Sequence, residues 1–143
     1  MGSLLFYSVS SEKAVNQPSD KNLLGNFIEE NGKRVEGEME FAAGMSGLFF
    51  LAAANLVGIE ALNHLREPEL GHGYLSKKEA QEAIVGLKAK LDPANEASKQ
   101  EISALVTEFD LDPEQFQEDS KTLIELLEGC LENGGEPFTS YHE

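Results

Sequence analysis

Apolar residues recur along this chain with two different periods, and the periods predict both strands and helices. Leu4 to Val9 is a short, apolar and partly aromatic run, which is typical of a strand. From Val35 to Phe41, apolar residues and a glycine alternate with glutamates, so this segment is expected to be a strand with an acidic outer face. Phe138 to Tyr141 is a candidate for a short final strand.

Apolar residues spaced three and four apart, bounded by capping residues, glycines and prolines, predict helices in the rest of the chain. Ser76 and Glu79 have the spacing of a capping box, and Asp112-Pro113 has the order of a cap followed by a first-turn proline. The expected helices run over about 20–31, 46–65, 76–91, 98–109 and 112–133.

These elements predict a predominantly helical α+β fold, with a small sheet of two or three short strands packed against four or five helices. The length of 143 residues suits one domain over 1–143. Helical spacing places six apolar residues in a shared core, namely Ile84, Leu87, Leu105, Phe109, Ile124 and Leu127.

The segment from Phe41 to Ile59 has 19 residues without a charge, which is close to the minimum for a membrane span. Polar and helix-weakening residues such as Asn55 and Gly58 interrupt it, and a glutamate flanks it on each side. We therefore expect a buried central helix and no membrane insertion.

The charge of the chain is strongly negative, with 26 acidic against 11 basic residues and a net charge of −15. Phosphate backbones and anionic lipids repel such a chain, so we expect no binding to nucleic acid or to a membrane surface. A cationic protein is the partner that this charge favours. The pattern leaves open whether copies of the chain also associate with one another.

The single cysteine, Cys130, cannot form an internal disulfide, and it falls on the apolar stripe of the last predicted helix. Met1 to Val9 has no basic residue before its apolar stretch, so it does not resemble a signal peptide. Together these features favour the cytoplasm.

Two short patterns suggest chemistry, and each has a simpler interpretation. Gly44-Met45-Ser46-Gly47 lies between a predicted strand and a predicted helix, like a nucleophile elbow, but its second glycine comes one residue early. Glu60 and His64 are four residues apart on a predicted helix and share a face, but a stable metal site needs further ligands.

Asp110-Leu111-Asp112 resembles the opening of a calcium loop, but position 115 is Gln where glycine is required. A helix cap accounts for it better. The sequence therefore assigns no catalytic residue, no cofactor and no metal ligand.

The acidic residues are concentrated near the C-terminus. Residues 1–100 hold 14 acidic residues and 10 lysines and arginines, whereas residues 101–143 hold 12 acidic residues and a single lysine, Lys121, with no arginine. Such a one-sided surface raises electrostatic repulsion within the folded protein, which favours a use in binding a partner. The alternative interpretation is that the acidic face only keeps the protein soluble. Positions between the apolar stripes are expected to form the partner surface: Glu114, Glu118, Glu125, Glu128 and Glu132.

The segment from Gly71 to Ala80, a glycine-rich loop followed by Tyr-Leu and a capped helix, resembles the YfbM-like family of uncharacterised bacterial proteins. The opening run from Leu5 to Ser10 and the closing helix with Phe138 to Tyr141 are similar in layout to that family. The resemblance implies an α+β domain, and it implies no activity and no site residues.

Three functional hypotheses follow. The leading one is an acidic protein-interaction module, in concrete form a bacterial immunity protein or another inhibitor that occupies a cationic cleft of a nuclease. The second is a small enzyme with a site near Ser46 or His64. The third is a subunit of a larger assembly, with the segment from Phe41 to Ile59 buried against a partner chain.

Overall fold

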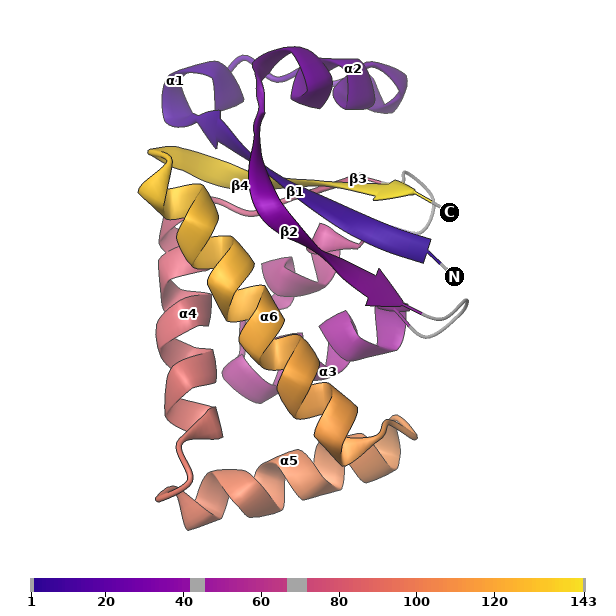
Figure 1. Cartoon of the computed structure of the whole chain (residues 1–143), viewed down its shortest axis with the longest axis vertical. Helices are drawn as coiled ribbons and strands as arrows, with labels where there is room; N and C mark the ends of the chain where they lie inside the picture. The colour runs from indigo at the N-terminus through magenta and orange to yellow at the C-terminus, as the bar shows by residue number, and fades with distance from the viewer. Residues whose placement is uncertain (1, 42–45, 67–71, 143) are drawn as a thin grey trace.

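The described residues fold around a four-stranded antiparallel sheet in which the strands lie in the order β2-β1-β4-β3 (Figure 1). The computed structural model describes residues 2–41, 46–66 and 72–142. The strands are β1 (Gly2–Ser10), β2 (Lys33–Phe41), β3 (His72–Tyr74) and β4 (Gly135–His142). The first and last strands of the chain are therefore neighbours at the centre of the sheet.

β1 is buried on both faces, which explains why its sequence is continuously apolar instead of alternating. Leu4 and Phe6 join the larger core, whereas Tyr7 and Val9 join a smaller core on the other face. β2 is an edge strand and alternates as predicted, with Val35 buried in the larger core and Glu36 exposed.

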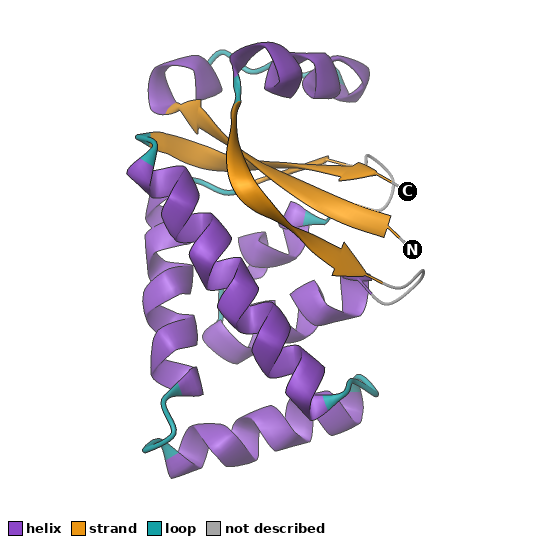
Figure 2. Ribbon diagram, viewed as in Figure 1, coloured by secondary structure: helices purple, strands orange, loops and turns teal. Residues whose placement is uncertain are grey.

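The helices form a thick layer on one face of the sheet and a thin layer on the other (Figure 2). The thick layer contains α3 (Ser46–Val57), the 3-10 helix η1 (Glu60–Leu65), α4 (Lys77–Leu91) and α6 (Pro113–Glu132). α5 (Glu96–Glu108) closes this layer at the end far from the sheet (Figure 1). The predominantly helical α+β class is confirmed. The described residues form four strands instead of the two or three expected, and seven helices, the 3-10 helix included, instead of four or five.

The predicted core is confirmed in the thick layer. Ile84, Leu87, Ile124 and Leu127 are buried together in one cluster. Leu105 and Phe109, from α5 and its C-cap, are partly buried and pack against the edge of that cluster.

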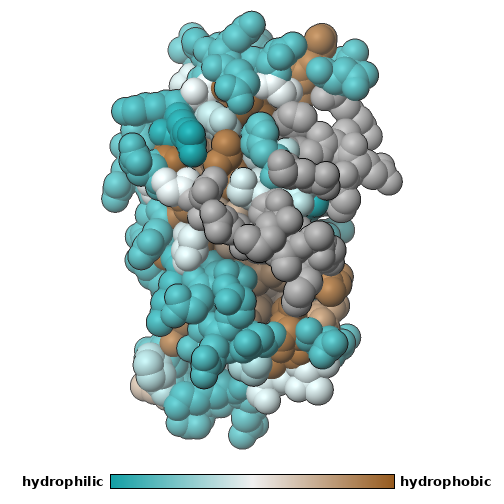
Figure 3. Space-filling model, turned by 45° about the vertical axis from the view of Figure 1, so that its right-hand side comes forward, coloured by the Kyte–Doolittle hydropathy of each residue, from teal (hydrophilic) through white to brown (hydrophobic). Residues whose placement is uncertain are grey.

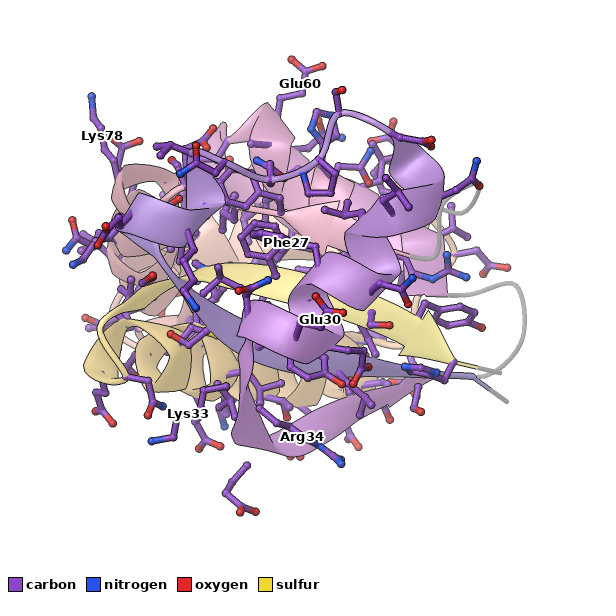
Figure 4. All side chains as sticks on the ribbon, turned by 90° about the horizontal axis from the view of Figure 1, so that it is seen from above. Phe27, Glu30, Lys33, Arg34, Glu60 and Lys78 are labelled. Atoms are coloured by element: carbon purple, nitrogen blue, oxygen red, sulfur yellow. The ribbon has the colours of Figure 1, made fainter. Side chains whose placement is uncertain are left out.

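The thin layer contains α1 (Ser11–Ala14) and α2 (Lys21–Asn31), which cover the other face of the sheet. Phe27 of α2 contacts Phe138 of β4, with 5.8 Å between the ring centroids. Seen from above, Phe27 lies over β4, whereas Glu30 lies on the outer side of the same helix (Figure 4). α2 thus has the amphipathic character that its apolar stripe predicts.

The starts of α4 and α6 follow the capping residues found in the sequence, whereas the start of α5 does not. The Ser76 and Glu79 side chains form the predicted capping box of α4. Asp112 caps α6 by accepting a hydrogen bond from the backbone N–H of Glu114 at 2.9 Å. α5 starts two residues before the predicted Ser98, because the Asn95 side chain caps it by accepting from the Ser98 N–H.

The apolar segment forms a shorter helix than predicted, since α3 ends at Val57 and does not reach Leu65. Gly58 ends it with φ +72°, a left-handed conformation that glycine adopts without steric cost, and η1 follows. One face of α3 is buried as expected, with Phe50, Ala52 and Ala53 fully inaccessible, whereas Leu48 and Leu51 are exposed. Within the described ranges, no helix combines the length and apolar character needed to cross a membrane.

β3 and α1 were not predicted from the sequence. β3 falls where a glycine-bearing loop was expected, and its pairing with β4 makes it a strand. Gly73 allows this edge to approach η1 closely, since a Cβ at that position would lie 2.2 Å from the backbone oxygen of His64. A three-residue strand fixed by a distant partner leaves no periodic pattern in its own sequence.

Candidate functional site: the acidic ridge of α6

The five glutamates predicted as a partner surface all project from one side of α6. At about 100° per residue, Glu114, Glu118, Glu125, Glu128 and Glu132 fall within an arc of roughly 80°. This arc lies opposite Leu123 and Leu127, which are fully buried. We call these five residues the acidic ridge. It extends over about 27 Å, the length of 18 residues of helix.

The ridge is accessible along its length but is not uniformly negative. Glu114, Glu118, Glu125 and Glu132 are exposed, whereas Glu128 is partly buried. Lys121, also exposed, falls in the middle of the same arc. The structure therefore places a positive charge between the two acidic halves of the ridge.

Several acidic groups of the C-terminal third have partners within the chain. Lys88 of α4 lies 3.0 Å from the Glu128 carboxylate, and Lys90 pairs with Glu101 of α5. Glu136 of β4 accepts a hydrogen bond from the hydroxyl of Tyr74 and is nearly inaccessible. The charge count along the sequence therefore overstates the charge that faces solvent, because it cannot see these tertiary partners.

The ridge borders a groove between α4 and α6, which the sequence did not reveal. The part nearer the sheet is a hollow of about 300 Å³, lined by Gln81, Ile84, Val85, Glu128, Leu131 and Glu132. The part nearer α5 is a second hollow of about 480 Å³ that shares Glu128 with the first. Val85 is 69% exposed, so an apolar side chain stands open to solvent beside the glutamates. In the sequence, only the position of Val85 just outside the apolar stripe of α4 indicates an exposed apolar side chain here.

On the face of the molecule that Figure 3 shows, most of the described residues of the helical half are hydrophilic. Figure 3 shows one face of the molecule, on which hydrophobic residues come to the surface only in small patches. Among the larger apolar side chains that the structure describes, those most open to solvent are Val15, Leu23 and Val85. Of these, Val85 lines the groove beside the acidic ridge.

The two patterns that suggested chemistry do not form a site among the described residues. Ser46 is the first residue of α3, but its side chain and the preceding Gly44-Met45 lie outside the description. Glu60 and His64 were expected to share a helix face. That interpretation is wrong, because they lie in a 3-10 helix, where residues four apart point about 120° away from each other.

Both of these side chains are exposed, and Glu60 points away from the molecule (Figure 4). Among the residues that the structure describes, no three His, Cys, Asp or Glu side chains gather closely enough to hold a metal ion. Asp112 acts as a helix cap, as the sequence indicated.

The surroundings of the buried Cys130 and of the partly buried Tyr74 shift the pKa values of both groups. Burial raises the pKa of the Cys130 thiol from 9.0 to about 12, so this side chain stays protonated in the core. Burial and the hydrogen bond to Glu136 raise the pKa of Tyr74. Both shifts favour the neutral form of the group, so neither group is activated as a nucleophile at neutral pH.

Comparisons with known proteins found no family model, no curated protein and no solved structure that matches this chain. The resemblance to the YfbM-like family therefore stays a prediction.

Proposed function

We propose that this chain is an acidic protein-interaction module that binds a cationic partner protein through the acidic ridge of α6, in the cytoplasm. Its concrete form would be a bacterial immunity or inhibitor-type protein that occupies a basic cleft of a nuclease. The observation that carries the proposal is the alignment of five glutamates along one accessible side of the longest helix described. Four of the five are exposed.

The physical basis is electrostatic steering. The five glutamates outnumber the one lysine, Lys121, along a ridge about 27 Å long, so its net field is negative and attracts and orients a basic surface before contact. Glu114/Glu118 and Glu128/Glu132 are pairs of like charge four residues apart, which destabilise a helix slightly. Lysine and arginine side chains of a partner would relieve this repulsion on binding.

A subunit role is the alternative that a specific observation favours. α3 presents Leu48 and Leu51 at the surface, with 39% and 36% of their area exposed. These two residues lie three apart and so share one side of the helix. In this alternative α3 contacts a partner chain and the acidic ridge maintains solubility.

The experiment compares two variants of equal net charge. The first replaces the acidic ridge with glutamine. The matched control replaces five glutamates elsewhere on the chain, all of them exposed: Glu12, Glu30, Glu60, Glu96 and Glu108. The partner is first captured with the wild-type chain from cells that produce it, then purified, and association rates are measured at low and high salt.

The ridge variant is expected to bind at least tenfold more slowly at low salt, with a flatter salt dependence, because charges at an interface act mainly on the association rate. The control variant should bind as the wild type does. Lys121→Gln should accelerate binding, since it removes the positive charge within the ridge. Equal rates for both five-fold variants at every salt concentration would mean that the ridge serves solubility only.

A further inference from the structure

The groove between α4 and α6 combines an apolar floor with an acidic wall. In the hollow nearer the sheet, Ile84 is buried, Leu131 is half-buried and Val85 is mostly exposed, so the apolar surface extends from the core to solvent. Glu128 and Glu132 line the α6 side of this hollow, and no basic residue lines it among the described residues. A single exposed apolar residue is ordinary, but one that continues into a hollow offers an anchoring position.

The hollow nearer α5 has a mixed character. Glu125 and Glu128 line it together with Lys88 and Lys121. In the hollow nearer the sheet, by contrast, the charged lining residues are all negative and the apolar surface is most exposed. Cationic groups and an apolar side chain would be bound together there.

We propose that this groove receives a basic amphipathic α-helix of the partner protein. Its apolar side chains would pack on Val85 and Leu131, and its lysines or arginines would bind Glu128 and Glu132. The inference rests on the proposed function and names the chemistry of the partner. A groove between two helices suits a third helix, because ridges of side chains on one helix fit between those of its neighbours.

Size and charge support this occupant. From Lys121 to Glu132 the α6 side of the groove extends over about 17 Å, or three helical turns. A second copy of this chain is disfavoured as the occupant, since it carries a net charge of −15 and would be repelled by the acidic wall.

The ion pair between Lys88 and Glu128 joins the two walls at the point where the hollows meet. Its side chains are 55% and 39% exposed, and ion pairs at such sites contribute little to stability. A basic residue of the partner can therefore replace Lys88 in the ion pair with Glu128 without a large loss of folding stability.

The experiment uses the full chain and a displayed library of helical peptides of about 18 residues, roughly five turns. Selected peptides are sequenced, and their affinities are measured for the wild type and for Val85→Glu, Val15→Glu and the ridge variant with five glutamines. Val15→Glu is the matched control, because Val15 is another exposed valine, at the end of α1. Far-UV circular dichroism establishes that each variant is folded.

Val85→Glu distinguishes apolar packing in the groove from electrostatic attraction, since it removes the apolar anchor while making the surface more negative. We expect the selected peptides to be basic with an apolar stripe. Val85→Glu should weaken their affinity at least tenfold, which corresponds to losing the burial of about half of a valine side chain. Val15→Glu should leave affinity unchanged. The ridge variant should weaken binding at low salt.

Two failures are distinguishable. If Val85→Glu binds basic peptides as tightly as the wild type or more tightly, while the ridge variant binds them weakly, the groove is not the docking site and the proposed function stands. If the ridge variant binds as the wild type does, or if the selected peptides carry no excess of basic residues, both the groove proposal and the proposed function are overturned.

Discussion

At the scale of single residues, Cys130 shows how the last helix is joined to the central strand. Its backbone carbonyl accepts a hydrogen bond from the Ser8 hydroxyl at 2.6 Å, and its thiol donates to the carbonyl of Tyr7 at 3.5 Å. Both partners lie more than a hundred residues away in the sequence. The cysteine is therefore a structural residue at the contact between α6 and β1, as its place on the apolar stripe predicted.

The raised pKa of Cys130 predicts a loss of stability at alkaline pH. The folded thiol ionises near pH 12 and the unfolded thiol near pH 9, so ionisation favours the unfolded chain between these values. The stability advantage of the wild type over Cys130→Ala should be constant below pH 9. Above it, the advantage should shrink by about 1.4 kcal/mol per pH unit.

Urea unfolding of both proteins at a series of pH values measures this difference. The raised pKa of Tyr74 also destabilises the folded state at high pH, but it is common to both proteins and cancels in the comparison. A difference that stays constant up to the pH at which the wild type unfolds would show that the thiol is accessible to solvent. Slow labelling of the native thiol by a disulfide reagent is the matching expectation.

At the scale of elements, α6 has two opposite faces with different roles. One face carries seven buried residues, among them Phe116, Leu123 and Leu127, and packs on α4 and the sheet. The opposite face carries the acidic ridge. Because the buried face fixes the rotation of the helix, it also determines which residues face solvent, so core packing positions the proposed interface.

Leu127 offers a direct test of that packing. The residue is fully buried, so Leu127→Ala should lower the free energy of unfolding by roughly 2–5 kcal/mol through lost burial and an internal cavity. Urea denaturation monitored by circular dichroism measures the change. Leu23→Ala serves as the control, because Leu23 is 52% exposed and its truncation should cost far less. Similar unfolding midpoints for the two variants would contradict the assigned core.

At the scale of the whole molecule, the excess of acidic groups makes folding dependent on salt. Like charges are closer together in the folded state than in the unfolded chain, so repulsion lowers stability when screening is weak. The screening length falls from about 30 Å at 0.01 M salt to about 8 Å at 0.15 M. The free energy of unfolding should therefore rise over this range of sodium chloride concentration.

The ridge variant and its control, each with five Glu→Gln substitutions, test this prediction further. Each removes the same number of negative charges, so both should show a weaker dependence of stability on salt than the wild type. The ridge variant should show the weakest dependence, since its glutamates are close neighbours on one helix. A wild-type stability that does not change with salt would mean that repulsion is already balanced by ion pairs such as Lys90–Glu101.

The sequence by itself determined those features that depend on near neighbours in the chain. The capping box at Ser76, the cap at Asp112, the alternation of β2 and the apolar stripe of α6 each involve residues a few positions apart. Local geometry is enough to predict such features, because hydrogen bonds and side-chain spacing within one or two turns specify them. The acidic ridge belongs to this class, since a helical period and its apolar stripe together indicate which side is exposed.

Only the tertiary structure decided which segments of the chain contact one another. The placement of β4 between β1 and β3, the pairing of Lys88 with Glu128 and the groove lined by Val85 and Leu131 all join segments distant in the chain. No local period encodes them, because long-range pairing is chosen by the best mutual burial of all elements at once. For the same reason β3 has no pattern of its own, and the charge count missed the partners of Glu101, Glu128 and Glu136.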